Sequence, residues 1–247
     1  LLIFYKYKQN MTKTIDIEEI KQKLFKKLEP SGWAKPLKSF IFSSDFENII
    51  MQLVRLSKDG KRFTPKLSQL FRAFEECPYN ELKVIMVGQD PYPKLGVADG
   101  IAFSCKNTME QQPSLRFILN EVNRTVYDGV GQSHDPDLTR WANQGMLMLN
   151  TALTTTVGKV GQHYTIWKPF LAYLFDHLTF AHTGMVFVYM GKQAHEWSDT
   201  VNDMNYKFFV SHPASAVYNK GQTWDCKDIF NEISKILKNH YNFSVTW

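Results

Sequence analysis

The sequence predicts a single α/β domain with a central, four-stranded, mostly parallel sheet flanked by helices. Four short apolar runs alternate with helical patterns after the first third of the chain. Strands that alternate with helices at this spacing form parallel sheets covered on both faces. The 247 residues, of which 44% are hydrophobic, suit one domain with a sizeable core. No repeat, low-complexity tract or linker divides the chain.

The individual elements follow from apolar runs and periodicity. The expected strands are Leu82–Val87, Met146–Leu149, Met185–Met190 and Tyr206–Val210. Apolar residues at helical spacing predict helices over 16–29, 44–56, 66–76, 114–127, 166–178, 192–201 and 227–237. We assign residues 16–247 to the domain and expect residues 1–15 to form a disordered extension.

Composition narrows the classes of function. The formal charge of +5 permits nucleic-acid binding, but an ordinary basic protein explains it equally well. The three cysteines form no C-x-x-C pair, and the seven histidines show no zinc-like grouping. No apolar run reaches the roughly 18–20 residues of a membrane span. We therefore expect a monomeric protein without a metal, cofactor or membrane segment. Its expected location is the cytoplasm, or the nucleus or a viral replication site in a eukaryotic host.

Polar residues follow the predicted strands at their carboxyl ends, where open parallel sheets bind ligands. Asp90 and Tyr92 follow the first strand, Asn150 ends the second and His212 follows the fourth. Together they offer a carboxylate, an aromatic wall, an amide and an imidazole, which suit a planar base. No serine or cysteine lies next to a plausible base, so nucleophilic catalysis gains no support.

Each of these residues has a simpler explanation when taken alone. Asp90 precedes a proline and suits an ordinary turn, and Asn150 suits a cap. His212 suits a hydrogen-bonded structural histidine. Their common position at strand ends favours a shared site over three independent structural roles.

Five segments resemble the uracil-DNA glycosylases of the metal-free, family 1 type, in the family's order and over roughly residues 30–240. They are Leu82–Tyr92, Gly100–Ser104, Gln112–Leu115, Leu147–Thr154 and Ser211–Ser215. The first resembles the water-activating loop with its strand, and the second the segment with the uracil-stacking phenylalanine. The third is similar to a loop that grips DNA phosphates. The last two resemble the uracil-recognition strand and the loop of the catalytic histidine.

The resemblance implies two catalytic residues. Asp90 would activate water for attack on the sugar C1′, or stabilise the positive charge that develops there. His212, as a neutral imidazole, would donate a hydrogen bond to uracil O2 as the base departs. One such donor is typically worth ~10²–10³ in rate.

Four further residues would hold the base according to the same resemblance. Gln89 would bind uracil through its backbone amide, and Phe103 would stack on the flipped ring. Tyr92 would occupy the space beside uracil C5 and exclude the methyl group of thymine. Asn150 would match N3–H and O4 of uracil but not the reversed pattern of cytosine.

The expected DNA-binding surface departs from the family pattern. Pro93 stands where the family usually has histidine, which removes a phosphate contact. In the loop after His212, the position of the usual wedge leucine falls on Ala216, which we therefore expect to contact DNA, and a loop one residue shorter would shift the alignment. We expect Val217 or Tyr218 to act as the wedge. The other expected phosphate contacts are Ser114, Ser215, Lys192, Lys220 and Arg116, although solvated surface charge explains any one of the cations equally well.

The main interpretation is therefore a glycosylase that flips uracil from single-stranded or duplex DNA, with a proteinaceous inhibitor as a further partner. The alternative is a replication-accessory protein that binds DNA on the same fold with vestigial catalysis, which the altered wedge loop favours. A complete base pocket argues against this alternative. A nucleotide-binding α/β protein is not supported, because Gly129-Val130-Gly131 does not continue into a phosphate-cradling loop.

Overall fold

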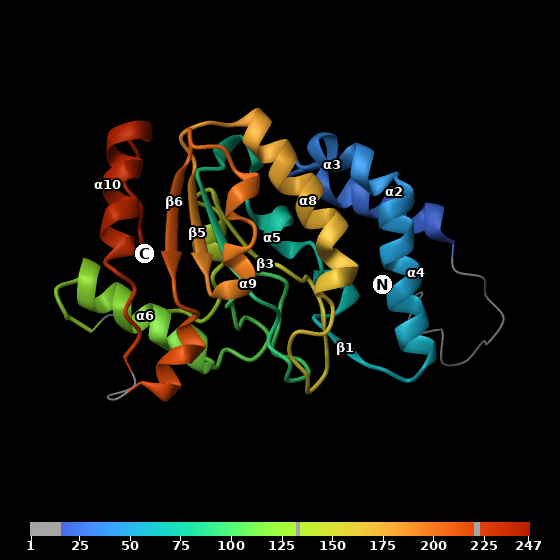
Figure 1. Cartoon of the computed structure of the whole chain (residues 1–247), viewed down its shortest axis with the longest axis horizontal. Coiled ribbons are helices and arrows are strands. Elements are labelled where there is room, and N and C mark those ends of the chain that lie inside the picture. The colour runs from blue at the N-terminus through green and yellow to red at the C-terminus, as the bar shows by residue number, and fades with distance from the viewer. Residues whose placement is uncertain (1–15, 132–133, 220–222) are drawn as a thin grey trace.

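The computed structural model describes residues 16–131, 134–219 and 223–247 (Figure 1). The expected extension at 1–15 and the expected phosphate contact Lys220 lie outside these residues. Among the described residues, no helix is long and apolar enough to cross a membrane.

A four-stranded parallel sheet forms the centre of the fold, as predicted. Its strands are β2 (Val84–Gly88), β3 (Met146–Asn150), β5 (Val186–Met190) and β6 (Tyr206–Val210), in the order β3-β2-β5-β6. Every residue of β2, β3 and β5 is buried, which explains why these strands appear in the sequence as continuous apolar runs. Strand β6 lies at the edge and keeps exposed positions. The register sets Gly88 beside Asn150 at the carboxyl ends of β2 and β3.

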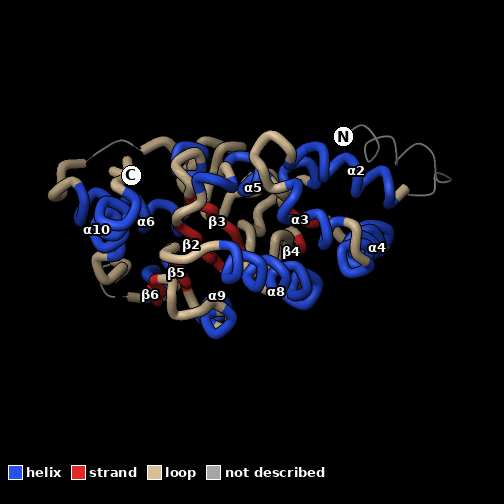
Figure 2. Tube along the Cα trace, turned by 90° about the horizontal axis from the view of Figure 1, so that it is seen from above, coloured by secondary structure: helices blue, strands red, loops and turns tan. Residues whose placement is uncertain are grey.

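Helices cover both sides of the sheet (Figures 1 and 2). One side carries α6 (Pro113–Val126) and α10 (Ile229–Tyr241). The other side carries α2 (Ile17–Leu28), α3 (Ala34–Ile41), α4 (Ser44–Lys58) and α8 (Tyr164–Ala181). The shorter elements are α5 (Arg72–Glu76), α7 (Thr139–Ala142), α9 (Lys192–His195), β1 (Phe63–Thr64), β4 (Thr155–Thr156) and the 3-10 helices Leu67–Gln69, Tyr79–Glu81, Ser198–Thr200 and Pro213–Tyr218.

Local signals explain where several helices begin. The side chain of Asp16 accepts a hydrogen bond from the Glu19 amide, and that of Ser43 accepts one from the Phe46 amide. Each satisfies a backbone donor that has no partner within its helix. Pro113 begins α6, where its missing N–H would have no helical acceptor.

Two predicted helices are interrupted. The segment 66–76 divides into the 3-10 helix Leu67–Gln69 and α5, because Phe71 leaves the helical conformation and Arg72 points to buried carboxylates. The segment 192–201 divides into α9 and the 3-10 helix Ser198–Thr200. In both segments tertiary contacts override local propensity.

The sequence analysis missed several short elements, among them helix α3 and strands β1 and β4. Helix α3 contains Pro36, which lies in the first turn and therefore breaks no helical hydrogen bond. Strands β1 and β4 form a two-residue antiparallel pair between distant segments. Periodicity cannot reveal a pair this short.

Candidate active site

A cavity of about 230 Å³ opens at the carboxyl ends of the parallel strands, where the sequence placed the site. All of the expected catalytic and base-binding residues line it, together with two expected DNA contacts. They come from three strand ends, the Phe103 loop and the first turn of α6: Gln89, Asp90, Tyr92, Asn150, His212, Phe103, Pro93 and Ser114. The third strand in chain order, β5, contributes through Gly191, against which His212 packs. The predicted convergence of Asp90, Tyr92, Asn150 and His212 therefore occurs in the structure.

Gly88 makes room for two of these side chains. A Cβ atom at this position would lie 2.5 Å from Oδ1 of Asn150 and 2.9 Å from the ring of Phe103. Its backbone φ is not in the left-handed region, so the glycine provides space and not an unusual conformation. Asn150 is only 8% exposed, and the close approach of the β2 backbone holds its amide at the cavity wall.

The carboxylate of Asp90 has a defined orientation and a perturbed acidity. The Gly161 N–H donates a 2.6 Å hydrogen bond to its Oδ2 atom. Burial raises the pKa of Asp90, while the Gly161 amide and the Thr155 hydroxyl oppose that rise by stabilising the charged form. Thr151 anchors the same loop, because its hydroxyl donates to the Gln89 carbonyl at 2.7 Å.

The tautomer of His212 follows from one contact. The backbone N–H of Ala214 donates to Nδ1 of His212 at 3.2 Å. A backbone amide can only donate, so Nδ1 is unprotonated and Nε2 carries the hydrogen of the neutral ring. Burial lowers the pKa of His212 to about 4, so this neutral form prevails at pH 7.

Two aromatic side chains form connected walls of the cavity. The hydroxyl of Tyr92 donates to the Phe103 carbonyl at 2.9 Å. Burial raises the pKa of Tyr92 well above its usual value, which keeps this donor protonated. Phe103 has a φ of 66°, an uncommon conformation for a residue with a side chain, and its ring lies 5.9 Å from that of His212.

A second, more open cavity of about 580 Å³ borders the first and forms the rim of the site. Both cavities share Gln89, Tyr92, Pro93, Ser114, His212 and Ala214. The rim adds Ser215, Val217 and Tyr218 of the 3-10 helix Pro213–Tyr218, together with Lys94 and Gln112. Tyr218 is 90% exposed and Val217 48%.

Three expected DNA contacts do not lie at this rim. Ala216 is fully buried, so its side chain is outside the surface that DNA can reach. The expectation of a contact at Ala216 arose from aligning a linear motif, whereas the 3-10 turn directs this residue inward. Lys192 and Arg116 are exposed but line neither cavity.

Several residues at the site were missed. Gly161 and Thr155 act on Asp90 from a loop more than sixty positions away, and Pro65, Leu70 and Val160 add apolar lining. Two glycines in the short segment 158–161 were the only available signal, and they indicate a turn without indicating what it contacts. Within the described parts of the chain, no three His, Cys, Asp or Glu side chains are grouped to hold a metal ion.

The fold and the cavity together define a class of enzyme. A buried carboxylate, a neutral imidazole donor and an amide surround a space lined by aromatic rings, and no activated serine or cysteine is present among the lining residues. Such a site suits hydrolysis of the bond between a planar base and a sugar without a covalent protein intermediate. This arrangement is that of a base-releasing glycosidase.

Comparisons with known proteins identify the family. Residues 74–238 match the family model of the uracil DNA glycosylase superfamily. The chain is 30% identical over 232 residues to the uracil-DNA glycosylase of Acinetobacter baumannii (strain SDF), covering 93% of this chain and 97% of the relative. It is 31% identical over 222 residues to that of Streptococcus pneumoniae (strain Hungary19A-6), covering 89% of this chain and 99% of the relative.

Solved structures agree. The crystal structure of mimivirus uracil-DNA glycosylase superposes with a TM-score of 0.80 at 25% identity, covering 90% of this chain and 88% of that one. A variant of the mimivirus enzyme, solved in complex with UGI, superposes with a TM-score of 0.77 at 26% identity over 87% of each chain. The chain therefore belongs to the uracil-DNA glycosylase superfamily, and its function is that of a DNA-repair glycosidase of this type.

Proposed function

We propose that this chain is a monofunctional, metal-independent glycosylase of the family 1 type, which flips uracil out of DNA and hydrolyses its bond to the sugar. The observation that carries this proposal is the meeting of Asp90, Asn150 and a neutral His212 in one cavity of about 230 Å³. An accessory protein that only holds DNA has no need of such a pocket. The accessory-protein alternative is therefore not favoured.

His212 stabilises the departing base. When the bond between C1′ and N1 breaks, its electron pair passes to the uracil ring, and negative charge develops on O2. The Nε2–H of His212 donates to that oxygen, and the Ala214 amide holds the ring in the required tautomer. The pKa of His212 near 4 keeps the ring neutral, so its proton stays in place as a hydrogen bond. One donor of this kind contributes ~10²–10³ in rate.

Asp90 acts on the water and on the sugar. The water oxygen forms the new bond to C1′, and the carboxylate accepts the proton that the water loses. The negative charge of the carboxylate also stabilises the positive charge that develops on the sugar. The Gly161 amide directs this role because it holds Oδ2 in one orientation.

The pocket walls select uracil. The Tyr92 ring, fixed through its hydroxyl to the Phe103 carbonyl, fills the space beside C5. The buried amide of Asn150 pairs with N3–H and O4, and cytosine would leave buried groups unpaired. We expect Tyr92→Ala to release thymine from DNA and Asn150→Asp to release cytosine. A product analysis by chromatography checks both, and an unchanged range of released bases would contradict the assignment.

The rim binds the DNA strand around the flipped base. Ser114 and Ser215 line this rim and supply hydroxyl donors for phosphates, whereas Pro93, which also lines it, has no donor to offer. Tyr218, more exposed than Val217, acts as the main wedge that fills the space left by the flipped base. The outlying Lys192 contributes charge at longer range.

A proteinaceous inhibitor is a further proposed partner. The mimivirus structure in complex with UGI superposes over 87% of this chain, which supports a similar surface here. The apolar, exposed Val217 and Tyr218 offer a contact for such a protein. Because the described site is built from one chain, we propose that the enzyme acts as a monomer.

The test uses labelled single-stranded and duplex oligonucleotides that carry one uracil, in the presence of EDTA, followed by alkaline cleavage at abasic sites. We expect cleavage at uracil alone, with activity on single strands at least equal to that on duplex, because flipping from a single strand requires no unpairing. Asp90→Asn runs beside the wild type and should lose ~10²–10⁴ in rate. DNA binding without cleavage of either substrate would restore the accessory-protein alternative.

A further inference from the structure

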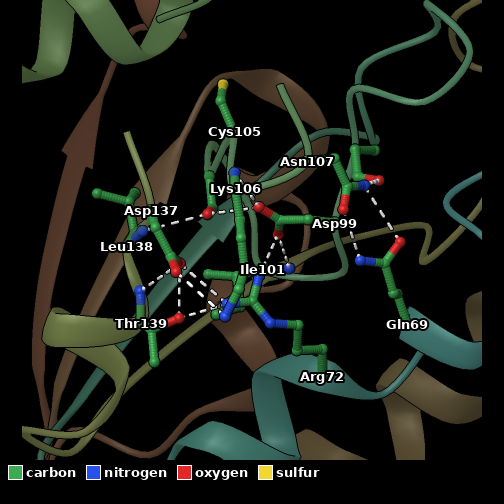
Figure 3. Close-up of polar contacts among 12 residues, drawn as sticks. Gln69, Arg72, Asp99, Ile101, Cys105, Lys106, Asn107, Asp137, Leu138 and Thr139 are labelled. Carbon is green, nitrogen blue, oxygen red and sulfur yellow. Dashed lines mark hydrogen bonds and ion pairs between the residues drawn. The ribbon is translucent and has the colours of Figure 1, made fainter. Parts of the chain in front are cut away.

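A buried ion pair between Arg72 and Asp99 joins α5 to the segment that leads into Ile101 (Figure 3). Nη1 of Arg72, in α5, lies 2.9 Å from Oδ1 of Asp99, whose side chain is fully buried. Neither residue lines the cavity, and the proposed chemistry uses neither of them.

Asp99 gathers donors from one short loop. Its Oδ1 atom accepts a hydrogen bond from the Ile101 amide at 3.0 Å. Its Oδ2 atom accepts from the Ser104 hydroxyl at 2.6 Å and from the Lys106 amide at 2.7 Å. Three donors on residues 101–106 therefore converge on a single carboxylate (Figure 3). Phe103 lies within the span that they define.

Arg72 connects that loop to a third segment. Its guanidinium also contacts Oδ1 of Asp137 at 2.9 Å and the hydroxyl of Thr139. The Leu138 amide donates back to the Ser104 hydroxyl at 3.1 Å, so the network closes on itself. Helix α5, the Phe103 loop and the segment before α7 are thus held together by charge-assisted contacts.

The restrained loop holds an uncommon backbone conformation at its centre. Phe103 has a φ of 66° and is not a glycine, so the surrounding contacts must maintain this conformation. The Phe103 carbonyl in turn accepts the hydrogen bond that fixes Tyr92. A displacement of the loop would therefore move both aromatic walls of the pocket together.

We infer that the Arg72–Asp99 pair is a positioning device for uracil recognition, which sets the stacking surface of Phe103 and, through its carbonyl, the position of Tyr92. This inference rests on the proposed function, because it takes Phe103 as the surface on which uracil stacks. A buried ion pair is a weak source of net stability but specifies one arrangement of the groups around it. The pair acts on binding of the base, since the loop that it braces carries Phe103 and contains neither Asp90 nor His212.

The experiment measures inhibition by free uracil, kcat, and release of 5-bromouracil for four variants of the full chain. Asp99→Asn keeps the shape but removes the charge that attracts Arg72, and Ser104→Ala removes one donor to Asp99. Glu76→Gln is the matched control, because Glu76 contacts the same guanidinium at 3.4 Å but has no bond to the loop. Phe103→Ala measures the full contribution of the stacking ring.

We expect Asp99→Asn to raise the uracil inhibition constant by about tenfold, the loss of part of one base–aromatic stacking contact. Ser104→Ala should raise it less and remains informative if Asp99→Asn does not fold. The kcat on a saturating single-stranded substrate should change less than about threefold, since uniform binding and not chemistry is weakened. Both variants should release 5-bromouracil more readily relative to uracil, while Glu76→Gln behaves as the wild type.

Three results would overturn the inference in distinguishable ways. If Phe103→Ala weakens uracil inhibition but Asp99→Asn and Ser104→Ala do not, the pocket assignment stands and the positioning role of the pair is wrong. If Phe103→Ala itself leaves inhibition unchanged, the assignment of Phe103 as the stacking surface falls together with the inference. A parallel fall in kcat, with a changed pH profile, would indicate general damage to the fold and would also contradict a positioning role.

Discussion

The base pocket and the DNA-facing rim are adjacent but are built in different ways. In the pocket, a fixed contact determines the position of each functional group: Gly88 packs against Asn150, Gly161 bonds Asp90 and Ala214 bonds His212. At the rim, the 3-10 helix Pro213–Tyr218 packs against α6 and presents Val217 and Tyr218 to solvent. The pocket depends on a rigid arrangement, whereas the rim depends on which side chains it exposes.

Because of this difference, the pocket governs the chemical step and the rim governs access to the base. Changes in the pocket should affect single-stranded and duplex substrates equally, because both must place uracil against the same groups. Changes at the rim should affect duplex more than single strands, because only duplex must be unpaired and unstacked. The ratio of the two activities therefore distinguishes the regions.

After the loss predicted for Asp90→Asn, the largest effect is expected from removing the imidazole of His212. His212→Ala should lower kcat by ~10²–10³ on both substrates, because one preorganised donor to the developing charge is lost. Single-turnover kinetics on single-stranded and duplex DNA check this. Ser215→Ala, on the same loop, is the control and should affect duplex binding only. A loss confined to duplex in His212→Ala would place this residue in the rim.

A large effect is also expected from adding a side chain at Gly88, where the pocket has no room for one. Gly88→Ala would place a Cβ atom 2.5 Å from Oδ1 of Asn150, so the amide or the strand must move. Misplacement of about 1 Å can cost ~10² in rate. Gly131→Ala is the matched control, because its added Cβ would meet no heavy atom within 4 Å among the described residues other than its neighbours along the chain. Equal activity of the two variants would show that the Asn150 position does not limit the reaction.

A smaller and selective effect is expected at the rim. Replacing Val217 and Tyr218 together by Ala removes the exposed apolar surface that would fill the space left in the duplex by the flipped base. Duplex activity should fall by about tenfold, as unstacking requires a few kcal/mol, while single-strand activity stays near the wild type. The two single variants show how much of the loss of duplex activity comes from each residue. We expect the larger part from Tyr218. Unchanged duplex activity in the double variant would contradict the wedge assignment.

The smallest expected effect concerns pH. Because the Thr155 hydroxyl lowers the pKa of Asp90 by stabilising its charged form, Thr155→Val should raise that pKa. The activity of the wild type falls as pH decreases through the Asp90 pKa. The variant should therefore lose activity at a higher pH than the wild type. A profile of kcat/KM against pH measures this, and a shift toward lower pH would reverse the assigned role.

The stability of an Asp90 variant tests how burial of this carboxylate affects folding. Burial raises the folded-state pKa of Asp90, so its charged form is disfavoured in the folded protein, and stability is lost as pH rises through that pKa. Asp90→Asn removes the charge but retains an acceptor for the Gly161 amide. The variant should therefore be at least as stable as the wild type at pH 7, as thermal unfolding would show, although it loses ~10²–10⁴ in rate. A less stable variant would mean that the charge contributes to folding.

Much of the fold and of the site was predictable from the chain alone. The strands β2, β3 and β5 were evident because each is buried on both faces and appears as a continuous apolar run. Asp90, Asn150 and His212 were evident because parallel strands deliver their carboxyl ends to one edge. Ala216 was misplaced, because a linear motif does not state which way a 3-10 turn directs each side chain.

The sequence by itself determined the order of the strands and helices along the chain and the chemical groups that the site contains. It did so because apolar periodicity and strand-end position depend on neighbours along the chain. Only the tertiary structure decided the protonation of His212, the orientation of Asp90 and the bracing of Phe103 by Asp99 and Arg72. These properties depend on desolvation and on hydrogen bonds between groups distant in sequence, which exist only once the chain has folded.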